Sequence, residues 1–415
     1  MKNLIPHTSS HATRSTALTA LAVAVVVAVA AGILAGAGNA APASAAGTAS
    51  PLQKKSERFK APTLVNGLLT VKGTNAGDRI ALRLQAGQPG IVEVDFGDDG
   101  SAEFSFERRE IAAIAVEAGN GADAVRIDEI NGVFADTIPT TIDGGNGQDR
   151  LVGGAGAGTL NGGNGNDALF GGNGNETLLG GNGNDSLAGG SGAGTLDGGN
   201  GDDTLAGGSG DEKLLGGNGD DSIDGNRGND VALMGNGNDT FTWDPGDGSD
   251  TIEGQNGNDT LLFNGANIAE QVELTANGDR LRFFRDIANI TIDTAGVERV
   301  DFNALGGADL VTVNDLSATD VNELNVDLAG SPGATGDDAA DRVIVNATNG
   351  DDTIKITGDA AAVQVSGLVP TVNVLHPEIT NDRLEIETLD GTDTVNSTGL
   401  TAGAIQLSID GTLVP

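Results

Sequence analysis

The stretch from Gly162 to Leu179 reads GGNGNDALF-GGNGNETLL, which is two copies of a nine-residue unit with the pattern G-G-x-G-x-D-x-L-x. About a dozen such units follow one another between Gly144 and Leu262. Their eighth position stays apolar, from Leu151 to Leu261, with the spacing kept in phase up to a short insertion near the end. A flexible glycine-rich linker has no reason to keep an apolar residue in one phase, so the run predicts a folded repeat structure.

Each position of the unit has a physical role. Glycine allows the backbone to take positive φ and turn tightly, which exposes carbonyl oxygens. The apolar eighth residue fits a short strand whose side chain faces inward. Turn and strand together make half a coil. Gly158 and Gly194 lack the carboxylate and lie thirty-six residues apart, as do Glu176 and Glu212, which indicates duplication of a two-coil block.

These units resemble the RTX, or haemolysin-type, family of calcium-binding nonapeptide repeat proteins. The resemblance covers Gly144 to Gly265, a little under a third of the chain. It implies an all-β fold, a right-handed parallel β-roll or β-helix solenoid, with a central roll flanked by wider β-coils. It also implies that two units complete one coil, so that residues eighteen apart lie over each other at roughly 4.8 Å.

Stacked aspartates at that spacing repel one another, and the cost grows as water is lost. Calcium removes the repulsion, because it takes six to eight oxygen ligands in a flexible geometry, whereas magnesium demands a stricter octahedron. Zinc is disfavoured because the repeats contain no Cys or His. We therefore expect multiple Ca²⁺ ions as the cofactor.

The sixth position of the unit sorts by parity into two columns. The odd units form a main column in which all seven residues are aspartate: Asp149, Asp167, Asp185, Asp203, Asp221, Asp239 and Asp259. The even units form a second column: Gly158, Glu176, Gly194, Glu212, Asp230 and Asp250. We predict calcium in the six gaps between the seven loops of the main column.

The second column is predicted to be mostly empty. Its glycines supply no carboxylate, and the extra methylene of its glutamates should move their oxygens away from the site. Asp230 and Asp250 are its best ligands, although Arg227 and a two-residue insertion at Trp243 and Asp244 put that gap in doubt. Binding by even loops through carbonyls and water stays open as an alternative.

The net charge of the chain limits the classes of partner that it can bind. With 22 basic and 59 acidic residues the formal net charge is -37. This argues against nucleic acid and against anionic membrane surfaces, and makes cations the natural counterpart. There are no cysteines, so disulfides do not hold the fold.

The sequence divides into five expected segments. An apolar stretch after Lys2 and Arg14, followed by Ala43-Ser44-Ala45, predicts an export signal. We expect a signal peptide (1–45), a linker (46–62), an N-terminal β-solenoid flank (63–142), the RTX roll (143–265) and a β-rich C-terminal flank (266–415). The protein should be secreted, without stable membrane insertion after cleavage; periplasm and an uncleaved signal anchor are the alternatives.

The flanks repeat a looser form of the pattern, a turn with an aspartate before an alternating strand. The aspartates are Asp78, Asp123, Asp309, Asp352 and Asp393, spaced 45, 43 and 41 residues apart within each flank. We expect wider coils that continue the stack, and aspartates that cap turns rather than bind calcium. The basic residues Arg280, Arg282 and Arg285 should pair with neighbouring acids.

The chain offers little for catalysis. After the signal, His376 is the one histidine, and tyrosine and cysteine are absent. No nucleophile elbow precedes it. We expect no catalytic residues and a secreted calcium-binding protein that folds or rigidifies on extracellular calcium, with a structural or interaction role. A calcium-dependent β-helix polysaccharide lyase or epimerase, and a surface adhesin, are the alternatives, with extracellular polysaccharide or a cell surface as the further partner.

Overall fold

The computed structural model describes residues 59–331 and 336–415. Their regular structure is almost entirely β: strands β1 to β35, and three short 3-10 helices at Arg108–Glu110, Ala135–Thr137 and Ile287–Asn289. The all-β prediction is confirmed. The expected signal peptide and most of the expected linker lie outside the described residues, although Phe59, at the end of that linker, stacks on Phe96 with ring centroids 4.2 Å apart.

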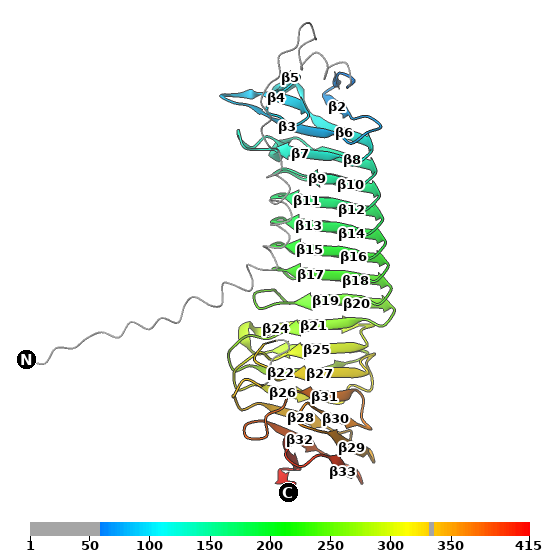
Figure 1. Cartoon of the computed structure of the whole chain (residues 1–415), viewed down its shortest axis with the longest axis vertical. Coiled ribbons are helices and arrows are strands. Elements are labelled where there is room, and N and C mark those ends of the chain that lie inside the picture. The colour runs from blue at the N-terminus through cyan, green and yellow to red at the C-terminus, as the bar shows by residue number, and fades with distance from the viewer. Residues whose placement is uncertain (1–58, 332–335) are drawn as a thin grey trace, which may run out of the picture. The chain divides into compact units, whose positions relative to one another are not determined.

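The strands of the repeats alternate between two parallel sheets, which Figure 1 shows stacked coil by coil. One sheet contains β8 (Thr140–Asn146), β10 (Gly158–Asn164), β12 (Thr177–Asn182), β14 (Thr195–Asn200), β16 (Lys213–Asn218), β18 (Val231–Asn236) and β20 (Thr251–Asn256). The other contains β9 (Arg150–Val152), β11 (Ala168–Gly172), β13 (Ser186–Gly190), β15 (Thr204–Gly208), β17 (Ser222–Asn226), β19 (Thr240–Trp243) and β21 (Thr260–Asn264).

The register is that of two units per coil. Leu160 on β10 pairs with Leu178 on β12, and Leu169 on β11 pairs with Leu187 on β13, eighteen residues on in each case. These eighth-position leucines are at most 1% exposed and form the core between the sheets. Burying each one contributes about 2 kcal/mol, which drives the sheets together. The parallel β-roll solenoid predicted from the repeats is therefore confirmed.

A ladder of asparagine amides runs along the turns that lead from the first sheet to the second. The Nδ2 of Asn164 donates to Oδ1 of Asn146 at 2.8 Å, and the pattern continues coil by coil to Asn256. These asparagines occupy the third position of the odd units. Their ladder fixes the register of the turns from outside, while the leucines fix it from inside.

The N-terminal flank continues both sheets in wider coils. Its strands are β1 (Thr63–Val65), β2 (Leu68–Lys72), β3 (Arg79–Gln85), β4 (Gln88–Phe96), β5 (Phe104–Glu107), β6 (Ala113–Asn120) and β7 (Ala124–Asp128). Arg79 pairs with Ala124, and Ala124 pairs with Arg150, so β3 and β7 lie in register with the repeats. The predicted 45-residue coil between Asp78 and Asp123 is thus correct.

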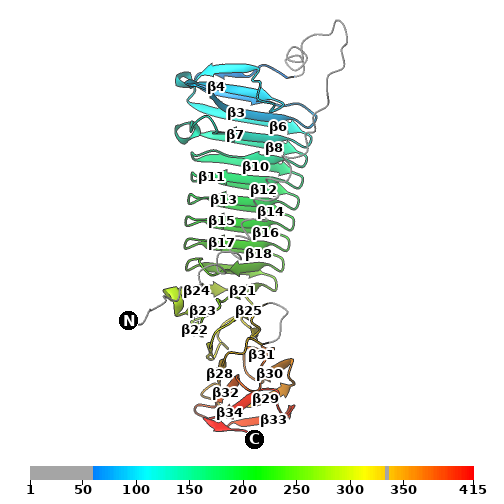
Figure 2. The same cartoon turned by 60° about the vertical axis from the view of Figure 1, so that its left-hand side comes forward.

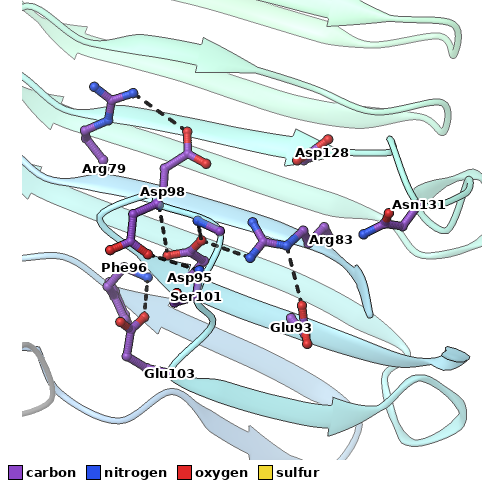
Figure 3. Close-up of polar contacts among 12 residues, drawn as sticks. Arg79, Arg83, Glu93, Asp95, Phe96, Asp98, Ser101, Glu103, Asp128 and Asn131 are labelled. Atoms are coloured by element: carbon purple, nitrogen blue, oxygen red, sulfur yellow. Dashed lines mark hydrogen bonds and ion pairs between the residues drawn. The ribbon is translucent and has the colours of Figure 1, made fainter. Parts of the chain in front are cut away.

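A buried ion-pair network stabilises the hairpin of β3 and β4 (Figure 3). The Nη2 of Arg83 lies 3.0 Å from Oδ2 of Asp95, and its Nε lies 3.4 Å from Oε2 of Glu93. The same Oδ2 accepts the amide of Gly100 at 2.8 Å. Asp95 is fully buried, and Arg83 supplies the counter-charge for its carboxylate.

The C-terminal flank inserts an antiparallel unit into the first sheet. That unit is formed by β22 (Gln271–Asn277), β23 (Arg280–Arg285) and β24 (Ile290–Ala295), and β22 then pairs with β26 (Leu310–Val313). The sheet goes on through β28 (Arg342–Asn346), β32 (Arg383–Glu387), β34 (Gln406–Ile409) and β35 (Thr412–Leu413). The second sheet goes on through β25 (Arg299–Asn303), β27 (Glu323–Asp327), β31 (Thr371–Leu375), β30 (Ala362–Ser366), β29 (Thr353–Gly358) and β33 (Thr394–Leu400), and Figure 2 shows this half from another side.

One expectation for this flank is wrong. Asp309 and Asp352 do not stack, because the strands that follow them belong to different sheets. Leu310 pairs with Arg342, so Asp309 lies next to Asp341, whereas Thr353 pairs with Thr394 and places Asp352 next to Asp393. The 43 residues from Asp309 to Asp352 therefore separate turns on opposite sides of the solenoid, because the coils of this flank differ in length.

The prediction that the basic residues pair with neighbouring acids is confirmed for Arg280 and Arg285, whereas Arg282 lies over the ring of Phe284 instead. Arg280 pairs with Asp293 at 2.6 Å and with Glu253 at 2.7 Å. Arg285 pairs with the buried Glu270 and lies over the ring of Trp243, which is itself fully buried. Phe263, Phe283 and Phe302 are also buried and belong to the core, whereas Phe284 is half-buried beneath Arg282.

Candidate metal centre

The seven aspartates of the main column lie together as one hydrogen-bonded ladder. Each stands at the end of a turn, immediately before a strand of the second sheet. The backbone N–H of each of the first six donates to Oδ1 of the aspartate in the next coil, and that of Asp259 donates to Oε2 of Glu298. The donor–acceptor distances are 2.7 to 2.8 Å from Asp149 through Asp259. The alternation between odd and even units therefore predicted which aspartates lie in one column. The hydrogen bonds from backbone amides to carboxylates that align the column were not predicted.

The second carboxylate oxygen has no partner in any of these residues. Oδ2 is buried and accepts no hydrogen bond in Asp149, Asp167, Asp185, Asp203, Asp221, Asp239 and Asp259. The side chains are at most 3% exposed. Buried polar atoms in proteins are nearly always paired, so a row of seven free anionic oxygens calls for a positive ligand or for protons.

The free oxygens face the turn of the following coil. A Cβ atom placed on Gly144 would lie 2.5 Å from Oδ2 of Asp149 and 2.8 Å from the carbonyl oxygen of Gly162. At Gly180 the same test gives 2.5 Å to both Oδ2 of Asp185 and the carbonyl oxygen of Gly198. The first glycine of the unit therefore keeps open a space lined by one carboxylate and one carbonyl from adjacent coils.

Burial makes these carboxylates hard to ionise. Desolvation raises the pKa of Asp149 and Asp185 to about 6, and that of Asp203 and Asp221 to about 7. Desolvation also raises the pKa of Asp167 and Asp239. The charged form lacks the water that would solvate it, and the neighbouring aspartates add repulsion at most of these positions. A dication in the column would reverse this balance.

The second column is discontinuous, as its sequence suggested. Gly158 and Gly194 bring no carboxylate, but both oxygens of Glu176 are buried inside their turn without a partner. Oε2 of Glu176 lies 3.3 Å from a Cβ placed on Gly171, whereas Oδ2 of Asp149 lies 2.5 Å from a Cβ placed on Gly144.

Asp230 and Asp250 reproduce the geometry of the main column. The amide of Asp230 donates to Oδ1 of Asp250 at 2.8 Å, and Oδ2 of both residues is buried without a partner. The two inserted residues are accommodated by the loop that follows Trp243, which is itself buried at the end of β19, so the ladder is not broken, and Arg227 is exposed. Arg227 and the two-residue insertion therefore leave the arrangement of Asp230 and Asp250 intact.

The donor set fits calcium better than a softer metal. Each position offers carboxylate and carbonyl oxygens, which hard cations prefer. The repeats contain no Cys or His, which structural zinc sites use. In residues 59–331 and 336–415 no three His, Cys, Asp or Glu side chains gather into one group, so an ion here would need carbonyl oxygens beside the carboxylates. The candidate ligands are therefore Oδ2 of each column aspartate and the carbonyl oxygen of the first residue in the following odd unit.

Other features of the described chain bear on function. His376 lies with Nδ1 2.7 Å from Oδ1 of Asp327, where strands β31 and β27 end. No helix within the described ranges has the length and apolar character needed to cross a membrane. Sequence reasoning also missed Asp341 and Asp382, which join the ladder of the C-terminal flank and stand before alternating strands like the other aspartates.

Comparison with known protein families agrees with this geometry. The model of the RTX calcium-binding nonapeptide repeat matches four times, at residues 143–178, 170–205, 206–241 and 246–267. The break between the last two matches coincides with the loop that follows Trp243. No curated protein matches the chain. Residues 143–267 of this chain are therefore an RTX calcium-binding nonapeptide repeat region.

Proposed function

We propose that this is an exported protein whose repeat region folds and stiffens when calcium fills the main column, and that its role is structural or one of interaction rather than catalysis. The observation that carries the proposal is the row of buried Oδ2 atoms without partners, each beside a carbonyl oxygen of the next coil. Without a cation, the folded column would hold seven closely stacked carboxylates in a water-poor site.

The chain's own residues prepare the site. The ladder from each aspartate amide to the next Oδ1 orients the carboxylates and leaves one oxygen of each free. The glycine turns bring carbonyl oxygens close to those free atoms. Bound calcium supplies the positive charge that offsets repulsion between coils.

Binding to the native state alone stabilises it by mass action. Extracellular calcium modules work at roughly 10⁻⁴ to 10⁻³ M. The repeats should therefore stay unfolded where calcium is scarce and form coils after export. Trp243 is buried, so it offers no exposed aromatic surface to a sugar chain.

The test is calcium counting joined to circular dichroism on the full chain. We expect β content to fall in chelator and return with calcium, and about six ions to bind in the main column, one for each gap between its seven loops. The pair Asp230 and Asp250 would account for one more. Unchanged β content in chelator would contradict coupled folding, and near a dozen equivalent ions would contradict a single main column.

A further inference from the structure

The aspartate ladder continues beyond the nonapeptides at both ends. In the N-terminal flank the amide of Asp78 donates to Oδ1 of Asp123 at 2.6 Å, and the amide of Asp123 donates to Oδ1 of Asp149 at 2.7 Å. In the C-terminal flank the ladder follows the other column. There the amide of Glu270 donates to Oδ1 of Asp309 at 2.7 Å, and the amide of Asp309 donates to Oδ1 of Asp341 at 2.8 Å.

The second oxygen divides these flanking aspartates into two kinds. In Asp78, Asp352 and Asp382 it accepts a backbone N–H of its own turn, four residues earlier, at 2.6, 3.0 and 2.7 Å. In Asp123 and Asp309 it accepts nothing and is buried. Both of these side chains are 2% exposed, so they share the arrangement of the main column.

The surroundings of Asp309 are strongly acidic. Glu270 and Asp341 stand on either side of it in the ladder, and Asp337 is nearby; among these, Glu270 is already paired with Arg285. No Lys, Arg or His forms an ion pair with Asp309 or Asp123 in the described part of the chain. Burial, reinforced by the neighbouring acids, raises the pKa of Asp309 to about 8.

An open pocket gives access to the turn that carries Asp309. It measures about 390 Å³ and is lined by Leu305, Gly306 and Gly307 of that turn, together with Asn267 and Asp337. The amide of Gly307 donates to Oδ2 of Asp337 at 2.9 Å, which ties the two sides of the pocket together. The pocket therefore opens onto residues 305–307, next to Asp309, which does not itself line it.

We propose that Asp309 and Asp123 each ligate a further divalent cation of the calcium class, outside the nonapeptide repeats. The proposal rests on the proposed function, because it extends to these residues the reasoning that a buried free Oδ2 in the ladder marks a cation ligand. It separates them from Asp78, Asp352 and Asp382, whose second oxygen closes a turn. The flanks would then contain both metal-ligating and purely structural aspartates.

These sites should bind more weakly than those of the repeats. Five residues before the aspartate, six of the seven positions of the main column have the glycine that keeps the space beside Oδ2 open, with Met234 before Asp239 as the exception, whereas the flanks have Ala118 and Ala304. Both alanines are buried, so their methyl groups narrow the turn. The flanking sites should therefore fill at higher calcium than the main column.

The test is amide hydrogen exchange of the full chain, measured by mass spectrometry in chelator and in millimolar calcium. At calcium ten times the dissociation constant, exchange through local opening should slow about tenfold. We expect this protection in peptides covering residues 303–314, and its loss in Asp309→Asn, while the repeats stay protected. Peptides covering residues 118–128 should behave in the same way in Asp123→Asn.

Asp382→Asn is the matched control, because it stands in the same ladder with its Oδ2 already bonded to the amide of Glu378. It should speed exchange equally with and without calcium and leave the calcium-dependent difference at residues 303–314 intact. Circular dichroism checks that each variant keeps its β content. Calcium protection of the repeats with none at residues 303–314, or protection there that survives Asp309→Asn, overturns the proposal for Asp309. Absence of calcium protection in the repeats would instead overturn the proposed function, and this inference with it.

Discussion

Replacing Asp185 by asparagine should have opposite effects on stability with and without calcium. Asp185 lies in the middle of the main column, where its Oδ1 accepts the amide of Asp167 at 2.7 Å and its Oδ2 has no partner. Asparagine keeps the first oxygen and replaces the free one with a neutral NH₂ group. The substitution therefore removes one buried charge and one candidate calcium ligand, and little else.

The calcium-free effect follows from the pKa of this carboxyl. Desolvation raises the pKa of Asp185 from 3.8 to about 6. At pH 7.5, where both the folded and the unfolded forms are ionised, a shift of about two units costs the folded state about 3 kcal/mol. Asp185→Asn should remove most of this penalty in chelator. In calcium it should lower the number of bound ions by one and reduce stability.

The measurements are the β content seen by circular dichroism in chelator, urea unfolding in calcium, and calcium counting after equilibrium dialysis. Asp202→Asn is the matched control, because it makes the same change of charge at an exposed position of the same turn type. It should change stability by only a few tenths of a kcal/mol. If Asp185→Asn destabilises the chelated protein as much as the calcium-loaded one, the reasoning about the buried charge is wrong.

Three further outcomes are expected. In chelator, β content should rise as the pH falls from 8 to 5, because burial raises the folded-state pKa values of Asp149 and Asp203 to about 6 and about 7, and the stability of the folded form is lost as the pH rises through these values. In calcium, the same acidification should release bound ions. Circular dichroism that does not change with pH would contradict both expectations. Gly180→Ala should weaken calcium binding, since its methyl would meet Oδ2 of Asp185 at 2.5 Å, whereas Gly90→Ala, with no atom within 4 Å, should not; equal calcium affinity of the two variants would refute the open turn. Arg285→Met should cost about 3 to 5 kcal/mol in urea unfolding by leaving Glu270 buried and unpaired, and adding Glu270→Gln should recover part of it; no recovery would show that the lost packing, not the charge, matters.

The sequence predicted the repeat region well because a fixed period carries its information. An apolar residue and an aspartate at constant phase are enough to set two sheets, eighteen residues per coil and one continuous carboxylate column. The hydrogen bond from each aspartate amide to Oδ1 of the next aspartate could not be predicted from the sequence, because it depends on the geometry of the turn. That bond is what leaves a single oxygen of each aspartate free.

The flanks were predicted less well because their coils vary in length. Between Asp309 and Asp341 the ladder advances 32 residues, and between Asp341 and Asp382 it advances 41. No constant period relates such turns, so Asp309 was matched with Asp352 of the other sheet. The aspartates of the flanks also look alike in sequence, although Asp382 closes its own turn and Asp309 does not.

The register of eighteen residues per coil constrains how this protein can change in length. Removing two consecutive nonapeptides would shorten the stack by one coil and leave every later aspartate on its original side. Removing one nonapeptide would exchange the two sides for everything that follows, and would set glycines and glutamates beneath the aspartates. Length variation among descendants of this sequence should therefore come in steps of eighteen residues, or in small loops such as the one after Trp243 that add residues without shifting the ladder.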